Sequence, residues 1–243
     1  MTAADDVADR AGDLETDPSP AQAHAGGPTS PPARRVHPIS LYEEALTGAP
    51  VLAVGAAEAR PLDVSTWSAP PSAVDEMILA RCEGPVLDIG CGPGRLAAAL
   101  GRRGVPCLGI DVSPRAVHEA RSRGAMALRR AVERPLPGEG RWGTALLADG
   151  NVGIGGDPAA LLARCRELVV PGGLVVVEAD PEPDVDEVSP VVLRAADGRE
   201  SHPMPWARVG VTALARLARG VGLEPEEEWI LGGRTIMALR RPR

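Results

Sequence analysis

Glycine stands at alternate positions in a short loop that follows an apolar run and precedes a predicted helix. Gly90, Gly92 and Gly94 give this glycine loop a G-x-G-x-G spacing, and Asp88 precedes it by two residues. Glycines allow positive φ and a close approach of the backbone to a ligand, and the helix start adds free N–H groups. A dinucleotide-binding loop has its third glycine where Arg95 stands here. The pattern therefore favours a cationic ligand over a pyrophosphate, which the carboxylate of Asp88 would repel.

A second carboxylate ends the next apolar run. Asp111 follows the glycine loop by about 20 residues, the spacing at which an acidic side chain meets the ribose of a bound nucleoside cofactor. Together the two features resemble the class I S-adenosylmethionine-dependent methyltransferase family, over a length from about Tyr42 to the C-terminus. Pro171-Gly172-Gly173 before a strand, and a final pair of strands, are further marks of that family.

The resemblance implies where S-adenosylmethionine binds. The glycine loop wraps the amino-acid part of the cofactor, Asp111 holds the ribose, and Val112 lies beside the adenine. The family often has an acidic residue at the adenine amino group, whereas this chain has Arg130 and two apolar residues there. The predicted cofactor-binding residues are Asp88, Gly90, Cys91, Gly92, Asp111, Val112, Ala131, Val132, Asp149, Gly150 and Tyr42.

A glycine-rich stretch from Ala148 to Pro158 follows the fourth predicted strand of the α/β pattern. It resembles an actinobacterial subgroup of small-molecule methyltransferases, and this resemblance places Asp149 and Gly150 beside the methyl donor. The predicted substrate residues are Asn151, Trp206, Arg208 and Trp67. The alternative role of Arg208 is to pair with acidic residues near it in sequence: Asp184, Asp186 and Glu187.

The sequence names no compelling general base. Methyl transfer from a sulfonium is an in-line displacement that depends chiefly on alignment, and it needs a base only when the acceptor is protonated. Of His37, His118 and His202, only His202 lies in a segment expected near a substrate, so it is the weak candidate for a catalytic residue. Cys91 lies within the glycine loop but is expected to pack rather than react.

Apolar runs bounded by turn residues predict strands that alternate with helices. The predicted strands are Pro85–Ile89, Pro106–Asp111, Ala125–Leu128, Thr144–Ala148, Leu174–Glu178, Glu228–Leu231 and Thr235–Leu239. Helices are predicted from Ile39, Pro71, Arg95, Pro114, Pro158 and Val211, with Pro171-Gly172-Gly173 ending the one from Pro158. Helices between strands imply right-handed crossovers and a parallel sheet covered on both faces. The predicted fold class is α/β, a Rossmann-like three-layer sandwich with a mostly parallel seven-stranded sheet and an antiparallel last strand.

Two segments lie outside this pattern. Residues 1–36 are rich in Ala, Asp, Pro, Gly and Ser, and we expect a disordered tail because such a stretch buries too little apolar surface to order itself. The methyltransferase-like domain then covers residues 37–243. Residues 181–205 form an insertion after a strand, which places them over the carboxyl ends of the sheet, where open α/β sheets bind ligands. We interpret this insertion as a lid.

Composition restricts the partners. The formal net charge of −7 argues against nucleic acid, which selects a basic surface. No apolar run approaches the roughly 20 residues of a membrane span, so the prediction is a cytoplasmic protein with no membrane partner. The cysteines are scattered and lack metal-ligand spacing, which predicts reduced thiols and no metal site. They are Cys82, Cys91, Cys107 and Cys165.

The main functional hypothesis is S-adenosylmethionine-dependent methyl transfer to O, N or C of a small molecule. A rival hypothesis is a regulatory or scaffolding subunit that binds the cofactor but catalyses no reaction. A second rival is a nicotinamide-dependent oxidoreductase, against which Asp88 and Arg95 both argue. The acceptor and the oligomeric state stay open at this point.

Overall fold

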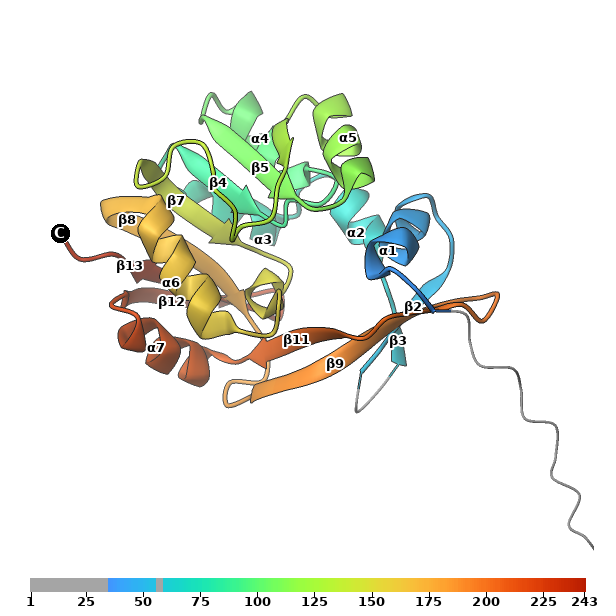
Figure 1. Cartoon of the computed structure of the whole chain (residues 1–243). Coiled ribbons are helices and arrows are strands. Elements are labelled where there is room, and N and C mark those ends of the chain that lie inside the picture. The colour runs from blue at the N-terminus through green and yellow to red at the C-terminus, as the bar shows by residue number, and fades with distance from the viewer. Residues whose placement is uncertain (1–34, 56–58) are drawn as a thin grey trace, which may run out of the picture. The chain divides into compact units, whose positions relative to one another are not determined.

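The computed structural model describes residues 35–55 and 59–243, and its central feature is a seven-stranded sheet (Figure 1). In spatial order the strands are β12 (Glu224–Leu231), β13 (Arg234–Arg240), β8 (Val169–Ala179), β7 (Trp142–Leu147), β4 (Val86–Ile89), β5 (Cys107–Asp111) and β6 (Met126–Arg129). β4 to β8 pair in parallel, and β13 is antiparallel to both β8 and β12. The predicted fold class is confirmed, and each predicted strand is present.

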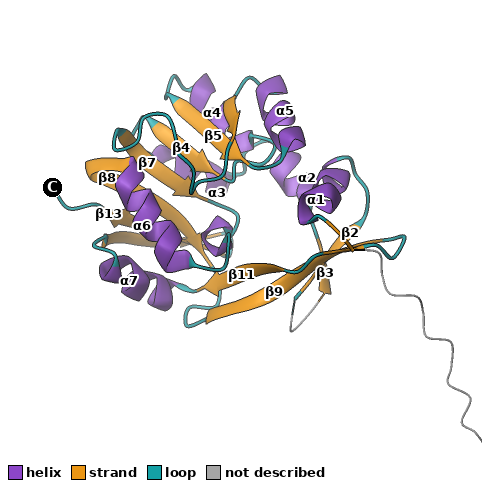
Figure 2. Cartoon of the chain, viewed as in Figure 1, coloured by secondary structure: helices purple, strands orange, loops and turns teal. Residues whose placement is uncertain are grey.

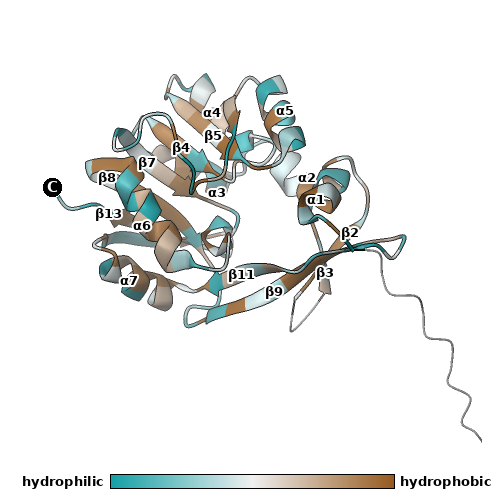
Figure 3. Cartoon of the chain, in the orientation of Figure 1, coloured by the Kyte–Doolittle hydropathy of each residue, from teal (hydrophilic) through white to brown (hydrophobic). Residues whose placement is uncertain are grey.

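Helices cover both faces of this sheet, because successive side chains of a strand point to opposite faces. The helices are α1 (Pro38–Leu46), α2 (Val64–Ser68), α3 (Ala73–Ala80), α4 (Arg95–Arg102), α5 (Pro114–Ser122), α6 (Pro158–Leu168) and α7 (Val211–Gly220). On β4, Val86 packs with α3, α4 and α5, whereas Leu87 and Ile89 pack with α6 and α7. Hydrophobic colour accordingly concentrates on the strands (Figure 3).

The helix signals in the sequence are mostly confirmed. Ser113 and Asp157 each cap a helix with a side-chain oxygen and precede a proline in its first turn. The prediction that Pro171-Gly172-Gly173 stops α6 is wrong. α6 ends at Leu168, and β8 begins at the next residue and includes the proline and both glycines. Val169 and Val170, which follow Leu168, belong to the strand and do not extend the helix.

A second, six-stranded sheet was not predicted. It joins β1 (Arg35–Val36), β10 (Glu200–Ser201), β9 (Asp186–Ala195), β2 (Val51–Val54) and β3 (Ala59–Pro61), and β11 (Met204–Val209) pairs with β9. The insertion at 181–205 supplies β9, β10 and the start of β11. The segment before the α/β pattern supplies β1, β2 and β3 (Figure 2). The insertion is therefore a long hairpin built into a sheet, and its action as a lid stays a prediction.

The predicted boundary of the tail is also wrong by two residues. Arg35 and Val36 form β1, which pairs in parallel with β10, so these two residues are not disordered. Residues 1–34 lie outside the described residues. Among the helices of the described chain, none has the length and apolar character needed to span a membrane.

α1 joins the second sheet to the first. Leu41 and Ala45 of α1 pack against Val51, Leu193 and Ala195 of the second sheet, and all five side chains are buried. The opposite side of α1 meets the start of α5. There the Glu43 carboxylate accepts hydrogen bonds from the hydroxyl of Ser113 at 2.8 Å and from the backbone N–H of Arg115 at 3.1 Å. This second sheet thus holds α1 beside the turn that follows Asp111.

Leu193 tests this joint, since it is 3% exposed in the cluster between α1 and the second sheet. Leu193→Ala should lower the free energy of unfolding by about 2–5 kcal/mol, because it removes buried methyl groups and leaves a cavity. Leu52→Ala is the control on the neighbouring strand β2, where the side chain is 38% exposed. Its expected loss of unfolding free energy is below about 0.5 kcal/mol. Urea titrations of the wild type and both variants measure these losses. Equal losses in the two variants would contradict a packed joint at Leu193.

Candidate functional site

The glycine loop turns back on itself at the carboxyl end of β4. Gly90, Gly92 and Gly94 have φ values of 70°, 52° and 82°, in the left-handed region that favours glycine. The backbone N–H groups of Gly90 and Cys91 both donate to the carbonyl of Ile110, at 2.9 and 3.0 Å. A Cβ on Gly90 would lie 2.7 Å from Nδ2 of Asn151, so this position has no room for a side chain.

Asp111 closes this loop with its carboxylate. One oxygen accepts from the backbone N–H of Gly92 at 3.0 Å, and the other accepts from that of Ser113 at 2.8 Å. Asp111 is buried, and that burial raises the pKa of its carboxyl above the ordinary range. A carboxylate has about four acceptor positions, so Asp111 retains capacity to accept from a diol such as that of a ribose. The predicted ribose acid and the glycine loop are therefore brought together.

A shallow hollow of about 290 Å³ opens next to Asp111. It is lined by Ile39, Val112, Arg129, Arg130 and Ala131. Val112 is 44% exposed, which leaves an apolar surface for a flat ring, and Ala131 faces the same space, as predicted for the adenine. The Val132 side chain is buried in the core under α6, so only the backbone of Val132 could contact the adenine, and its predicted role stays a prediction.

Two aromatic residues stand at the glycine loop on the side of α1 and α2. The hydroxyl of Tyr42 lies 3.4 Å from the place that a Cβ on Gly92 would occupy. Trp67 meets Tyr42 edge-on, with ring centroids 6.1 Å apart. Burial, with the charge of Asp111 next in effect, raises the pKa of Tyr42, so its hydroxyl stays protonated. Tyr42 thus lies at the glycine loop, whereas Trp67 contacts Tyr42, and the predicted roles of both stay predictions.

Cys91 packs as the sequence predicted. A Cβ on Gly109 of β5 would lie 2.7 Å from the sulfur of Cys91, so the thiol fills the space over that glycine. Burial raises the pKa of the Cys91 thiol well above its ordinary value, and a protonated thiol is a poor nucleophile. Cys91 can therefore contribute to a ligand site only through its backbone.

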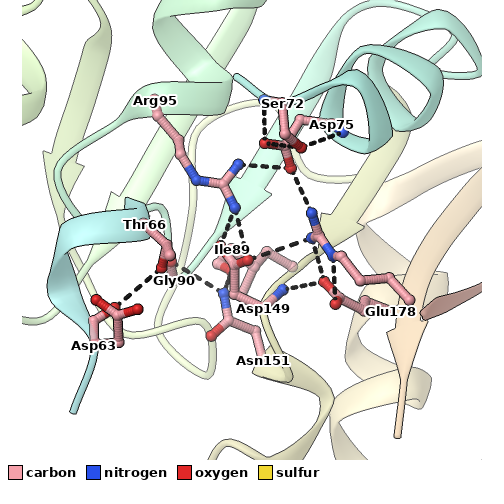
Figure 4. Close-up of polar contacts among 11 residues, drawn as sticks. Asp63, Thr66, Ser72, Asp75, Ile89, Gly90, Arg95, Asp149, Asn151 and Glu178 are labelled. Carbon is pink, nitrogen blue, oxygen red and sulfur yellow. Dashed lines mark hydrogen bonds and ion pairs between the residues drawn. The ribbon is translucent and has the colours of Figure 1, made fainter. Parts of the chain in front are cut away.

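The turn after β7 is strained and is tied to the glycine loop. Asp149 has φ of 54°, and it is the only residue other than glycine with positive φ in the described part of the chain. Gly150 follows with φ of 76°. Asn151 then donates from Nδ2 to the carbonyls of Ile89 at 2.9 Å and Gly90 at 3.0 Å (Figure 4). The prediction that Asn151 contacts substrate needs correction, because its amide N–H groups hold the glycine loop.

A buried ionic network holds Asp149 in this conformation. Nη2 of Arg95 lies 2.6 and 2.7 Å from the two carboxylate oxygens of Asp149, and Nη1 lies 2.8 Å from Asp75. Arg234 binds Glu178, Asp75 and Asp149 with its nitrogens. The backbone N–H of Asp149 also donates to Glu178, at 2.6 Å. Figure 4 shows Arg95 reaching both Asp75 and Asp149, with Glu178 on the other side of Asp149.

Asp88 lies beneath the start of α4 and faces the same side of β4 as Val86. Its side chain is buried, and its oxygen Oδ2 has no hydrogen-bond partner among the described residues. Burial raises the pKa of Asp88 to about 7, and the carboxylate of Asp149 adds to the rise, while Arg95 opposes it. Asp88 is thus a buried acid behind the glycine loop rather than a carboxylate on its open side.

The remaining predicted residues lie away from the glycine loop. Arg208 binds Asp180 and Glu187, both at 2.9 Å, so of the three acids named from the sequence only Glu187 is a partner, and its role toward substrate gains no support. Trp206 packs on the turn at Gly153, where a Cβ would lie 2.6 Å from its ring nitrogen. The ring therefore fixes that turn to β11.

Of the histidines in the described residues, none forms a hydrogen bond or ion pair with the glycine loop. His202 is exposed at the turn between β10 and β11, and its backbone N–H donates to the carbonyl of Val36. The weak candidate for a catalytic residue therefore gains no support. His37 caps α1 by accepting from the backbone N–H of Ile39, and His118 is exposed on α5. The described residues hold no cluster of metal ligands either.

The sequence interpretation missed Asp75, Glu178 and Arg234. Ser72 and Asp75 form a capping box at the start of α3, and the S-x-x-D spacing is a readable signal for that helix start but not for the ion pairs. Arg234 follows two glycines that form the turn between β12 and β13. Nothing local distinguishes this arginine, because its partners are distant in sequence.

The raised pKa of Asp88 predicts a pH dependence of stability. Between about pH 4 and its folded pKa of about 7, folded Asp88 keeps a proton that the unfolded chain has lost. Its contribution to the free energy of unfolding therefore falls as the pH rises through this window. Denaturant titrations of wild type and Asp88→Asn from pH 5 to 8 measure this. The wild type should lose stability relative to Asp88→Asn as the pH rises, whereas parallel curves would contradict a raised pKa.

Comparison with known proteins supports the assignment of this fold. Residues 86–173 match a family model described as a methyltransferase domain. The chain is 35% identical over 96 residues to a ubiquinone biosynthesis O-methyltransferase of Cereibacter sphaeroides, covering 37% of this chain and 39% of the relative. A relative of the same description from Pseudomonas aeruginosa is 37% identical over 99 residues, of which the match covers 41%. The chain thus matches about two fifths of the length of these curated relatives.

Solved structures extend the likeness beyond this segment. A SAM-dependent methyltransferase from Bacteroides fragilis in complex with S-adenosyl-L-homocysteine aligns with a TM-score of 0.70 at 17% identity, over 85% of this chain and 95% of that one. A 1,6-didemethyltoxoflavin-N1-methyltransferase from Burkholderia thailandensis aligns with a TM-score of 0.54 at 20% identity, over 74% and 82%. The protein therefore has the fold of class I S-adenosylmethionine-dependent methyltransferases, and its residues 86–173 match their methyltransferase domain.

Proposed function

We propose that the protein transfers a methyl group from S-adenosylmethionine to O, N or C of a small molecule. The observation that carries this proposal is the contact between Asp111 and the glycine loop. The Asp111 carboxylate holds Gly92 in place at 3.0 Å and keeps acceptor positions for a diol, next to the hollow lined by Val112 and Ala131. A nucleoside needs this combination of a diol acceptor and an apolar surface for its ring.

The residues present fit S-adenosylmethionine. Asp111 would hold the ribose hydroxyls, and Val112 and Ala131 would contact the adenine. The amino-acid part would lie against the backbone of the glycine loop, where Gly90 and Gly92 leave no Cβ in the way. Behind this loop the three acids Asp75, Asp149 and Glu178 pair with only two guanidiniums, those of Arg95 and Arg234. The resulting excess of negative charge suits a ligand with an ammonium and a sulfonium.

When bound, this cofactor supplies an electrophilic methyl group for an in-line displacement. The contribution of the chain is alignment, which can supply much of the rate enhancement of such a reaction. Asn151 and Asp111 hold the glycine loop from two sides, so the loop is fixed before any ligand arrives. Tyr42 and Trp67 stand over the loop and would cover the ligand from the side of α1 and α2. The raised pKa of Tyr42 makes its hydroxyl a donor rather than a base.

Three observations support a small-molecule acceptor. The net charge of −7 opposes binding of a polyanion. The Burkholderia structure is described with 1,6-didemethyltoxoflavin bound, and the matched curated relatives are described as ubiquinone biosynthesis enzymes.

The glycine-rich turn from residue 148 to 158 further supports the proposal that the protein belongs with actinobacterial small-molecule methyltransferases. We also propose a cytoplasmic location.

Calorimetric titration with S-adenosylmethionine tests the first half of this proposal. The wild type should bind, and Asp111→Ala should weaken binding by about 1–3 kcal/mol, because the loss removes charge-assisted hydrogen bonds. Asp197→Ala is the control, since Asp197 is an exposed acid in the hairpin turn of the second sheet. Its affinity should equal that of the wild type. No binding at millimolar cofactor, or an unchanged affinity in Asp111→Ala, would contradict the ribose site.

The second half of the proposal, methyl transfer to an acceptor, is tested by turnover. The measurement is the formation of S-adenosylhomocysteine in the presence of a panel of phenols, amines and stabilised carbanions. Cofactor binding without turnover on any acceptor would favour the rival role of a regulatory or scaffolding subunit. Binding of a nicotinamide cofactor in place of S-adenosylmethionine would favour the oxidoreductase.

A further inference from the structure

The ionic network behind the glycine loop connects residues from widely separated parts of the chain. We propose that Arg234, together with Asp75, is a positioning residue for the cofactor site, acting through the turn at residues 149–151. This inference rests on the proposed function. Both residues lie outside residues 86–173, the segment that matches a methyltransferase domain. Neither has a polar contact with the glycine loop among the described interactions, so any effect on the loop must pass through other residues.

Arg234 is placed by the last hairpin of the sheet. The turn before it packs on α3, since a Cβ on Gly232 would lie 3.0 Å from Val74. This contact brings the Arg234 guanidinium to Asp75 of α3, with a nitrogen–oxygen distance of 2.7 Å. The same guanidinium binds Glu178 at the end of β8 with Nε at 2.7 Å and Nη2 at 2.5 Å. Such a two-pronged pair fixes both partners in orientation as well as distance.

Glu178 and Asp149 connect Arg234 to the turn at residues 149–151. The Glu178 oxygen that Arg234 holds also accepts from the backbone N–H of Asp149, at 2.6 Å. The Asp149 carboxylate meets Nη2 of Arg234 at 3.3 Å and Nη2 of Arg95 at 2.6 Å. A residue other than glycine keeps a φ of 54° only when its surroundings hold it there. The network is what holds Asp149.

The turn then acts on the loop. Two residues after Asp149, the Asn151 side chain donates to the carbonyls of Ile89 and Gly90. A Cβ on Gly90 would collide with that amide, so turn and loop are in close contact. If Asp149 relaxes to a common backbone conformation, Asn151 must move, and the glycine loop loses one of the two side chains that hold it by hydrogen bonds. The other support, Asp111, acts on Gly92 from the opposite side.

Charge makes the network sensitive to the loss of Arg234. Asp75 and Glu178 are largely buried, with side chains 5% and 13% exposed. Removal of one member of a buried ion pair leaves the other charge without a partner, which is costly, so the acids must rearrange or take up protons. Arg95 is 6% exposed and already bound to Asp75 and Asp149, so it has little freedom to replace Arg234.

The variants are chosen to separate positioning from stability. Arg234→Gln removes the charge, and Arg234→Lys keeps it but cannot form the two-pronged pair with Glu178. Arg240→Gln is the matched control. Arg240 is on the same strand at the opposite end of the sheet, where it binds Glu226 at 2.6 Å and the carbonyl of Gly172 at 2.7 Å. Calorimetry gives the Kd of S-adenosylmethionine and of S-adenosylhomocysteine, and a thermal melt gives the Tm of each variant.

Arg234→Gln should raise the Kd of both ligands by about tenfold and by the same factor, because the defect lies in loop geometry, which both ligands share. Arg234→Lys should give an intermediate Kd. Arg240→Gln should lower the Tm and leave both Kd values within about twofold of wild type. The double variant Arg234→Gln/Glu178→Gln should bind as Arg234→Gln does, since coupled residues lose their effect together.

Two results would overturn the inference. One is an Arg234→Gln variant that is folded and binds both ligands within about twofold of wild type. The other is an equal loss of affinity in Arg240→Gln, which would mean that any loosening of β13 weakens the site. If Arg234→Gln does not fold, Arg234→Lys carries the same comparison with Arg240→Gln. A wild type that binds neither ligand would contradict the proposed function instead, so the two failures are distinguishable.

Discussion

The arrangement of the site depends on how a loop of glycines can be held still. The three glycines have no side chains with which to anchor the loop, so apart from the packing of Cys91 on Gly109 its order must come from groups outside it. Asp111 supplies an acceptor for the N–H of Gly92, and Asn151 supplies donors for the carbonyls of Ile89 and Gly90. Both residues follow strands that flank β4 in the sheet, which explains why the parallel order of β5, β4 and β7 matters to the site. Because these strands point the same way, their carboxyl ends deliver an acid and an amide to opposite sides of one loop.

That edge of the sheet also concentrates charge. The acids behind the loop are buried, and a buried acid needs a partner or a proton. Arg95 and Arg234 pair with Asp75, Asp149 and Glu178, whereas Asp88 has an unpartnered oxygen and a pKa raised to about 7 by burial. The two solutions differ in consequence: the paired acids transmit position between elements, whereas Asp88, with a pKa of about 7, is only partly ionised near neutral pH.

Much of this could be predicted from sequence because its signals are local. The strand that runs into the glycine loop, the acid that ends β5 and the capped helices each depend on a few neighbouring residues, and each is present. The second sheet escaped prediction because β1, β3 and β10 have only two or three residues each, and because many of its strand partners are remote in sequence, as in the pairing of Val51 with Ala195. For the same reason Asn151 was assigned to substrate: its sequence position is beside the site, but only the fold shows that its amide points back to Gly90. The ion pair of Arg208 with Glu187 follows from the pairing of β11 with β9, which places these two residues opposite each other.

The pairing of β2 with β9 has a consequence for the order in which the chain folds. Residues 51–54 leave the ribosome long before residues 192–195, their partners in the sheet. Until that hairpin is synthesised, β2 can pair only with β3, and α1 lacks Leu193 and Ala195, which help to bury Leu41. Loop-closure entropy must also be overcome before so distant a pairing forms, and domains rich in non-local contacts fold slowly. During synthesis, therefore, the strands around the glycine loop can assemble while the segment that carries Tyr42 waits, which makes α1 a late addition to the site.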